Sequence, residues 1–524
     1  MITYRILLPI FSAWQCLVAV ALAEDPAPTN AAPVKPNVIF ILTDDQGYGD
    51  LSAHGHPLLK TPNFDRMHNE GVRFDNFYVS PSCSPTRAAL LSGMHEFRNG
   101  VTHTRDPREH LHKDATILPQ LLSKTGYRNG FIGKWHLSQS PGYAPQERGF
   151  DWCSTNSNGP LEHFDPVMIR NGKKDKVSGF REDIYFSDAM TFISESGDRP
   201  FFLYLSTYSP HTPLAVPESF IAPFRGKVDD EQAAYLGMVA NLDYNIGRLL
   251  DFLAERKLDK NTIVVLMNDN GQTCGLDVYN AGMRGCKTTA WQGGSRAFSF
   301  WRWPEKWTPH KVDNLTAHLD FLPTICELTG TEIPKPIQDQ LEGFSLVPLL
   351  EAKGPVSWHD DRMVFIHTGR WPSGMAAAHK YAKASVLQDH FILVRNRACD
   401  APTCSAEILG ECDTLRDVEK GRKTAIYTKE NAQLHWGITP PGRWALYDLK
   451  NDIACQNDIA EQNLERVKSM SVAYEKWWDE LFPIMIARGG DAEMSEMIKK
   501  RSEQASQKSD ASNEPTPPKV ESAK

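Results

Sequence analysis

The sequence lacks an excess of positive charge. Its 57 lysines and arginines are outnumbered by 65 aspartates and glutamates, which gives a formal net charge of −8 at pH 7. Proteins that bind nucleic acids through their phosphates carry basic patches and are usually basic overall. We therefore expect no nucleic acid among the partners of this protein.

Beyond residue 23, the sequence also lacks an apolar run long enough to span a bilayer. Residues 1–23 are typical of a secretory signal peptide, because Arg5 precedes a mostly apolar stretch that ends in an A-x-A cleavage motif. Pro9 interrupts that stretch and makes it a poor membrane anchor. These features predict an exported protein, either periplasmic, secreted or lumenal, with no stable membrane span.

A closely spaced quartet of cysteines and histidines, as a zinc site needs, is missing as well. Of the ten cysteines, Cys16 falls in the predicted signal peptide and Cys83 lies in a distinctive proline-containing segment. The other eight are an even number, which is compatible with disulfides in an oxidising compartment, although their pairing cannot be deduced. They are Cys153, Cys274, Cys286, Cys326, Cys399, Cys404, Cys412 and Cys455.

The length of 524 residues favours two domains with tails over one small core. Patterns of fully buried strands alternate with helices in the first part, which predicts an α/β domain with a mostly parallel sheet at residues 24–355. Short alternating strands, followed by a helix expected from about Glu461 to Leu481, then predict a C-terminal α+β subdomain with an antiparallel sheet at residues 356–489. Residues 490–524 are rich in Lys, Glu, Ser and Pro, and we expect a disordered tail there.

Acidic and amide side chains follow two of the predicted buried strands. Asp44 and Asp45 come directly after the apolar run 37–43, and Asp269 and Asn270 follow a second run that begins at Thr262. Such strand ends often serve only as turns or caps. Because the carboxyl ends of parallel strands share one edge, however, these four residues can converge. Their oxygen ligands favour a hard cation, Ca²⁺ first and Mg²⁺ second.

Residues 81–93 predict an anion site. Two prolines force extended or turn backbone, and the following residues predict a helix that Gly93 closes. Cys83 and Thr86 then lie at the helix N-terminus, where unpaired N–H groups attract an anion, and the guanidinium of Arg87 suits a tetrahedral oxyanion such as sulfate or phosphate. Taken alone, Cys83 could equally be half of a disulfide or a buried thiol.

The segment Cys-Ser-Pro-Thr-Arg at residues 83–87 resembles the C-x-P-S/T-R signature of the type I sulfatases. The resemblance covers roughly residues 36–480 and includes further motifs in the family's order. These are G-K-W-H at 133–136, P-H-x-P at 210–213, R-G-x-K at 284–287 and L-Y-D-L at 446–449. Two positions depart from the family pattern: Thr86 stands where most members have Ser, and Cys286 stands where most have Gly. A disulfide from Cys286 to Cys274 is one explanation of the second departure.

This resemblance implies an alkaline-phosphatase-like fold with the large sheet between helices, and it makes residues 24–355 the catalytic domain. It also implies that a formylglycine-generating enzyme oxidises Cys83 to formylglycine (3-oxoalanine), whose hydrate is the nucleophile. Asp44, Asp45, Asp269 and Asn270 would hold one Ca²⁺ together with residue 83.

The remaining site residues take their roles from the same resemblance. Arg87 would steady the modified residue and the metal cluster, and Lys134 and Lys287 would bind sulfate oxygens. His136 would accept a proton from the hydrated aldehyde, and His211, with Lys287, would protonate the leaving group. The two histidine roles are interchangeable at this stage.

We therefore expect a sulfuric ester hydrolase of the arylsulfatase type that releases sulfate from O-sulfate monoesters, with a sulfated polysaccharide or glycan as substrate and partner. Two alternatives stay open. One is a phosphonate or phosphate-ester hydrolase on the same scaffold, and the other is a catalytically silent, metal-stabilised glycan-binding protein. Specificity is expected in loops 151–179 and 397–437, whose residues do not identify a sugar.

Overall fold

The computed structural model describes Met1 and residues 35–399 and 437–490 of the chain. The predicted signal peptide, the tail beyond residue 490 and nearly all of the loop 397–437 lie outside these residues. Within the part that is described, no helix is both long enough and apolar enough to cross a membrane.

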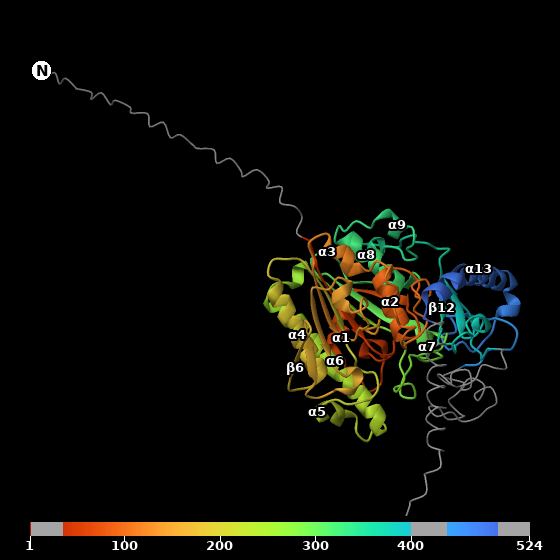
Figure 1. Ribbon diagram of the computed structural model, residues 1–524, viewed down its shortest axis with the longest axis horizontal. Coiled ribbons are helices and arrows are strands. Elements are labelled where there is room, and N and C mark those ends of the chain that lie inside the picture. The colour runs from red at the N-terminus through yellow and green to blue at the C-terminus, as the bar shows by residue number, and fades with distance from the viewer. Residues whose placement is uncertain (2–34, 400–436, 491–524) are drawn as a thin grey trace, which may run out of the picture. The chain divides into compact units, whose positions relative to one another are not determined.

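An 11-stranded sheet organises most of the molecule (Figure 1), and its main path runs in the order β10-β2-β9-β8-β1-β7-β3-β4-β5-β6, with β11 beside β2. Its central pairs, β8 with β1, β1 with β7 and β7 with β3, are all parallel. Antiparallel pairing occurs toward the two edges. The predicted mostly parallel α/β sheet is thus confirmed. The strands are β1 (Asn37–Thr43), β2 (Val72–Tyr78), β3 (Arg128–Gly133), β4 (Trp152–Asn156), β5 (Val167–Arg170), β6 (Lys173–Lys176), β7 (Phe201–Ser206), β8 (Thr262–Asn268), β9 (Arg296–Arg302), β10 (His310–Val312) and β11 (Thr316–Ala317).

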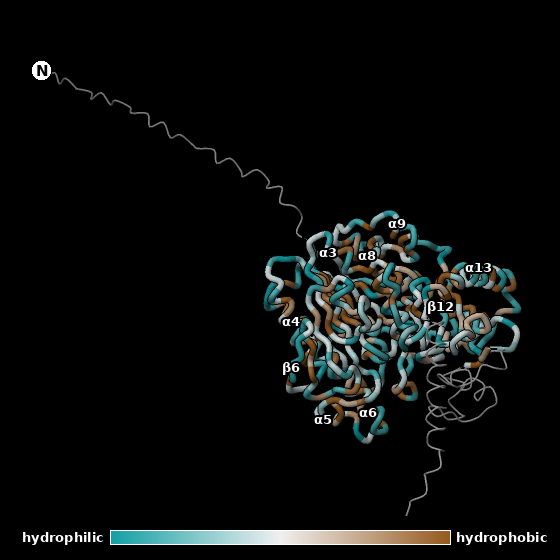
Figure 2. The backbone as a smooth tube through the Cα atoms, viewed as in Figure 1, coloured by the Kyte–Doolittle hydropathy of each residue, from teal (hydrophilic) through white to brown (hydrophobic). Residues whose placement is uncertain are grey.

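Both faces of the central strands are buried. Along β1, Val38, Phe40 and Leu42 join one hydrophobic cluster, whereas Ile39 and Ile41 join another on the opposite face. This alternation explains why the sequence shows a continuous apolar run, since neither face meets water. Hydrophobic segments accordingly run through the interior in Figure 2, and hydrophilic ones follow many outer turns.

Helices pack on both faces of the sheet and complete the two hydrophobic clusters. On one face, α2 (Cys83–Ser92) and α3 (Leu118–Ser123) pack with α8 (Phe321–Leu328). On the other, the packing helices are α1 (Pro62–Glu70), α4 (Arg181–Ser196) and α6 (Asp230–Glu255). The shorter helices are α5 (Glu218–Ile221), α7 (Gln292–Ser295), α9 (Lys335–Gln338) and α10 (Val347–Leu350).

A second, antiparallel sheet follows in the chain and contains four strands, as the alternating pattern predicts. Its strands are β12 (Met363–His367), β13 (Ala384–Gln388), β14 (Phe391–Arg395) and β15 (Ala445–Asp448). Helix α13 (Leu464–Arg488) packs on this sheet through a core rich in tryptophan. The exact division of the chain at residue 355 remains a prediction.

Two local expectations differ from the structure. The C-terminal helix, expected to end near Leu481, continues through Pro483 to Arg488, because Met485 is still buried in the aromatic core. The suggested Cys274–Cys286 disulfide is absent. Cys274 is a free thiol whose sulfur lies near Thr273 and Glu231.

Candidate active site

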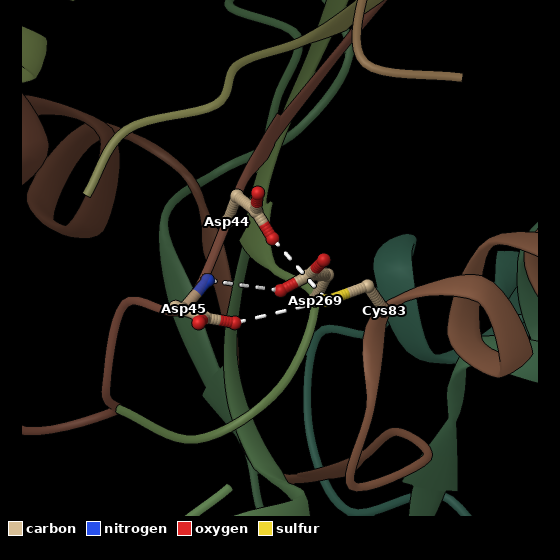
Figure 3. A group of neighbouring side chains, drawn as sticks. All are labelled: Asp44, Asp45, Cys83 and Asp269. Atoms are coloured by element: carbon tan, nitrogen blue, oxygen red, sulfur yellow. Dashed lines mark hydrogen bonds between the residues drawn. The ribbon is translucent and has the colours of Figure 1, made fainter. Parts of the chain in front are cut away.

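Three carboxylates and one thiol meet at the carboxyl edge of the large sheet (Figure 3). Asp44 and Asp45 follow β1, Asp269 follows the neighbouring β8, and Cys83 is the first residue of α2. One ligand atom from each of the four residues lies within 4.8 Å of the others, and all four are buried. Sequence positions as far apart as 44 and 269 thus form a single cluster.

Local backbone geometry turns these side chains toward one another. Asp45 has a positive φ of 61°, a conformation that aspartate tolerates better than most residues, and it bends the chain directly after β1. Its backbone N–H donates to Oδ1 of Asp269 at 3.1 Å. On the helix side, Gly93 closes α2 in the left-handed conformation, as expected from the sequence.

Hydrogen bonds connect the thiol to the acidic residues. The Cys83 thiol donates to Asp44 Oδ1 at 3.4 Å and to Asp45 Oδ1 at 3.7 Å. The Asn270 amide donates to Asp45 Oδ1 at 2.9 Å. Oδ1 of Asn270 is buried and accepts no hydrogen bond from any described residue.

Three cations neutralise the three carboxylates. Lys134 Nζ lies 2.6 Å from Asp44 Oδ2. Lys287 Nζ lies 2.5 Å from Asp45 Oδ1 and 3.3 Å from the Cys83 sulfur. The third cation is Arg87, which bonds to several elements at once.

Arg87 is fully buried and forms the centre of the site's support. Its Nη2 lies 2.8 Å from Asp269 Oδ2 and 3.7 Å from Asp44 Oδ1. Its Nη1 donates to the Lys134 carbonyl at 2.9 Å and to the hydroxyl of Ser206, the last residue of β7. One guanidinium therefore fixes the ends of four strands, β1, β3, β7 and β8, relative to α2.

Burial and charge act against each other on the acidic residues. Burial alone would raise the pKa of Asp44, but the surrounding cations, Lys134 first, hold that pKa well below its ordinary range. Burial and the Asp44 charge raise the pKa of Asp269 to about 7, although Arg87 opposes the rise. Burial also raises the pKa of the Cys83 thiol to about 12. The unmodified thiol is therefore protonated at neutral pH.

The acidic cluster fits a hard metal ion. Its carboxylate oxygens and the unpartnered amide oxygen of Asn270 are the donors that Ca²⁺ and Mg²⁺ prefer. Buried carboxylates this close together favour a cation that would offset their mutual repulsion. Asp44, Asp45, Asp269 and Asn270 could thus hold a metal next to residue 83.

Both sequence-predicted histidines lie in loops that follow strands of the sheet. Nε2 of His211 lies 3.6 Å from Asp45 Oδ2, so it borders the acidic cluster directly. His136, after β3, has Nε2 at 3.2 Å from the Thr104 carbonyl and at 3.4 Å from a carboxylate oxygen of Glu109. His136, His211 and Lys134 line one cavity of about 580 Å³, whose other walls carry Glu109, Asn156, Tyr208 and further polar groups.

Several contacts of the site could not be predicted from the sequence. Ser206 ends a strand as an ordinary residue, and Glu109 lies in an irregular loop outside every recognised motif. Residue types and spacing therefore indicated the primary site residues but not the groups that hold them.

The two departures from the family pattern are accommodated locally. The Thr86 hydroxyl donates to the Ser80 carbonyl at 3.0 Å, a bond that a serine hydroxyl could also make. Cys286 is buried, and its backbone N–H donates to the Thr289 hydroxyl at 3.1 Å.

Comparison with known proteins identifies the family. The Sulfatase family model matches residues 36–331. Rat (Rattus norvegicus) N-acetylgalactosamine-6-sulfatase is 32% identical over 409 residues, which span 70% of this chain and 72% of that protein. Human (Homo sapiens) arylsulfatase A is 31% identical, over 61% of this chain and 68% of that protein. The crystal structure of Ps i-CgsB in complex with k-i-k-neocarrahexaose has a TM-score of 0.69 and 25% identity, covering 84% of this chain and 92% of that one. The chain belongs to the sulfatase family and is a sulfuric ester hydrolase.

Proposed function

We propose that this protein releases inorganic sulfate from O-sulfate monoesters of a sulfated carbohydrate, with Cys83 converted to formylglycine as the nucleophile. One observation carries the proposal. The side chain of residue 83 points from a helix N-terminus into a buried pocket that holds three carboxylates and two lysines. Such a pocket can bind both a hard cation and a tetrahedral anion.

The electrostatics of Cys83 favour the modified form. The nucleophile of a cysteine is its thiolate, and burial that raises the thiol pKa to about 12 leaves almost none at neutral pH. A hydrated aldehyde at the same position needs only a neighbouring base to become a nucleophile. We therefore propose that a formylglycine-generating enzyme acts on Cys83 during maturation, and that the protein is exported by the predicted signal peptide.

Formylglycine would supply chemistry that an ordinary hydroxyl cannot. One hydroxyl of the hydrate would pass its proton to a neighbouring carboxylate and attack sulfur, and the S–O bond to the alcohol would break. The second hydroxyl then loses its proton, the C–O bond to sulfate breaks and the aldehyde returns. Water rehydrates the aldehyde, so the cycle needs no oxidant or reductant.

The chain's own residues would divide the remaining work. Lys134 and Lys287 lie on two sides of residue 83 and would hold sulfate oxygens. His211 would protonate the departing alcohol, and His136 would take the proton of the second hydroxyl. Each such proton transfer typically contributes about 10²–10⁴-fold to the rate.

A bound metal would supply Lewis-acid stabilisation of the sulfate oxygens and of the ionised nucleophile. Asp44, Asp45, Asp269 and Asn270 would hold it, with Ca²⁺ preferred over Mg²⁺ because all four ligands offer oxygen in a site built from flexible carboxylates. All of these residues, together with the residues assigned to catalysis, lie between positions 44 and 287. Their range supports residues 24–355 as the catalytic domain and 356–489 as the subdomain.

A sulfated carbohydrate is the substrate class that the relatives favour. One of them is named for a sulfated N-acetylgalactosamine, and the crystal structure of i-CgsB holds a neocarrahexaose. The cavity lined by Lys134 is large enough for a sugar unit and presents hydroxyl and amide groups that can pair with sugar hydroxyls.

Mass spectrometry and sulfate release test the proposal together. Protein from a host with the modifying enzyme should give a peptide across residues 81–87 with cysteine replaced by formylglycine, and it should release sulfate from members of a panel of sulfated sugars. A peptide with an intact thiol and no released sulfate would contradict the proposal and favour a silent binding protein.

A further inference from the structure

The two ring nitrogens of His136 differ in their hydrogen-bond partners. Nε2 lies 3.2 Å from the Thr104 carbonyl oxygen and 3.4 Å from Glu109 Oε2. Nδ1 is buried and has no hydrogen-bond partner among the residues that the structure describes. The two nitrogens therefore have opposite surroundings.

Both partners of Nε2 can only accept hydrogen bonds, because a carbonyl oxygen and an ionised carboxylate have no proton to donate. A neutral imidazole carries one N–H, and it is most stable where acceptors surround it. The proton must therefore sit on Nε2. Nδ1 then carries the free lone pair and is the nitrogen that can accept a proton.

Glu109 is itself fixed by its loop. The backbone N–H of Ser138 donates to the Glu109 carboxylate. The neighbouring Arg108 donates from Nε to the Thr102 hydroxyl at 2.9 Å, and the Thr102 N–H donates back to the Arg108 carbonyl at 3.1 Å. One closed loop thus presents both acceptors, Thr104 and Glu109, to His136.

The charges around His136 disfavour its protonated form. Burial, followed by the positive charges of Lys134 and Arg87, lowers the pKa of His136 well below its ordinary value, and Asp44 opposes this only in part. Protonating Nδ1 would therefore be costly without a carboxylate close to the ring. A carboxylate oxygen of Glu109 lies 3.4 Å from Nε2, across the ring from Nδ1.

We infer that Glu109 is a positioning residue for His136, which holds the proton on Nε2, leaves Nδ1 to receive the proton of residue 83's second hydroxyl, and stabilises the imidazolium that results. The inference rests on the proposed function, since it assigns His136 as the proton acceptor.

Replacing Glu109 tests this role. Second-sphere carboxylates that orient a histidine typically contribute about 10–100-fold, so Glu109→Ala should lower kcat by about 100-fold and Glu109→Gln, which keeps an acceptor oxygen, by about 10-fold. KM should change much less than kcat, because Glu109 acts through His136. Formate should restore part of the activity of Glu109→Ala. Combining Glu109→Ala with His136→Ala should be no worse than His136→Ala alone.

The matched control is Asp106→Asn in the same loop. Asp106 is an exposed carboxylate that pairs with His110 rather than with His136, so its loss should leave kcat within about twofold of wild type. An unchanged kcat in Glu109→Ala, or a change confined to KM, would overturn the inference. An equal loss in Asp106→Asn would also overturn it, because loop charge in general would then be responsible.

A measurement without turnover separates the inference from the proposed function. In protein labelled with ¹⁵N-histidine, with His136 assigned by its loss in His136→Gln, the ring should show the Nε2–H tautomer, and Glu109→Ala should mix the tautomers. An Nδ1–H tautomer in the wild type would contradict the inference even if the enzyme hydrolyses sulfate. Wild-type protein with the Nε2–H tautomer but no sulfatase activity would contradict only the proposed function.

Discussion

Among the individual residues, Arg87 joins several parts of the site through its side chain. Its side chain has no exposed surface, and it bonds to Asp269, Ser206 and the Lys134 carbonyl. A lone buried charge is expensive, so each of these partners depends on the guanidinium being present. The family resemblance predicts that Arg87 steadies the modified residue and the metal cluster, and in the structure its guanidinium pairs with Asp269 and lies near Asp44.

Removing this guanidinium should lower the free energy of unfolding. Arg87→Met leaves the Asp269 carboxylate buried without its partner, which should cost about 3–5 kcal/mol of unfolding free energy in metal-free protein. Arg87→Lys keeps the positive charge but loses the planar guanidinium that bonds to two partners at once. Its unfolding free energy should therefore fall by less than that of Arg87→Met. Urea unfolding of the three proteins measures both values. Equal stability of Arg87→Met and wild type would show that the pair contributes nothing.

A second buried charge supports the segment that precedes Cys83. Glu96 accepts a hydrogen bond from the Ser80 hydroxyl at 2.6 Å and lies near His95 and His318. Burial would raise its pKa, but the His95 charge and the hydrogen bonds outweigh burial and lower the pKa of Glu96 from 4.5 to about 2. Ser80 also accepts from Thr86, so this network supports the segment that carries Cys83.

This shift predicts a specific dependence of stability on pH. Because the folded-state pKa is depressed, Glu96 stabilises the native state above pH 4.5, and this contribution of about 3 kcal/mol disappears as the pH falls toward 2. Glu96→Gln should therefore be less stable than wild type at pH 7, and the difference should shrink toward pH 3. Denaturant unfolding at both pH values provides the comparison. A difference that grows on acidification would contradict the assignment.

Among the structural elements, close backbone contacts hold the loop that carries Asp269 and Asn270, the residues proposed to bind the metal. Gly271 follows Asn270 directly, and its N–H donates to the Gly294 carbonyl at 2.9 Å. A Cβ atom at Gly271 would lie 1.8 Å from the Gly293 carbonyl oxygen, closer than any contact can be. The loop after β8 can therefore approach α7 only because residue 271 has no side chain.

Gly271→Ala should consequently push the Asn270 loop outward. We expect weaker metal binding, seen as a smaller rise in melting temperature on adding Ca²⁺, together with lower stability of the metal-free protein. Gly354→Ala is the matched control, since a Cβ at Gly354 meets no atom within 4 Å, and its effect should stay within about 0.5 kcal/mol. Unchanged Ca²⁺ stabilisation in Gly271→Ala would contradict this explanation.

Elements are also the scale at which the sequence was most informative. Strand β1 was predicted to the residue, because a run buried on both faces is apolar throughout and ends abruptly at Asp44. The start of α2 was marked by two prolines and its end by Gly93. The extension of α13 through Pro483 depends on tertiary packing of Met485, and the Glu109 contact depends on how a loop folds back. Neither has a local pattern in the sequence.

Across the whole molecule, the two sheets are tied together by buried polar and aromatic contacts. Arg362, just before β12, forms a two-point pair with Asp320, at 2.7 and 2.8 Å. Phe97, in the segment after α2, packs against Trp477 and Trp478 of α13. The region after residue 355 therefore stabilises the segment that follows the nucleophile's helix.

Breaking the Arg362 pair should weaken this attachment. Arg362→Met leaves Asp320 buried without its cation and should lower the unfolding free energy by about 3–5 kcal/mol. Arg225→Met removes exposed pairs with Glu218 and Asp230 and should lower the unfolding free energy far less. Thermal unfolding of both variants against wild type measures the contrast. Similar losses in the two variants would contradict a structural role for the buried pair.

The most direct test of the central claim compares a matched aryl sulfate and aryl phosphate monoester as substrates for the mature protein, with Cys83→Ala as the control. We predict hydrolysis of the sulfate in preference to the phosphate, and no sulfate hydrolysis by Cys83→Ala. Faster turnover of the phosphate by a wide margin, or sulfate turnover that survives in Cys83→Ala, would contradict a formylglycine sulfatase built around residue 83.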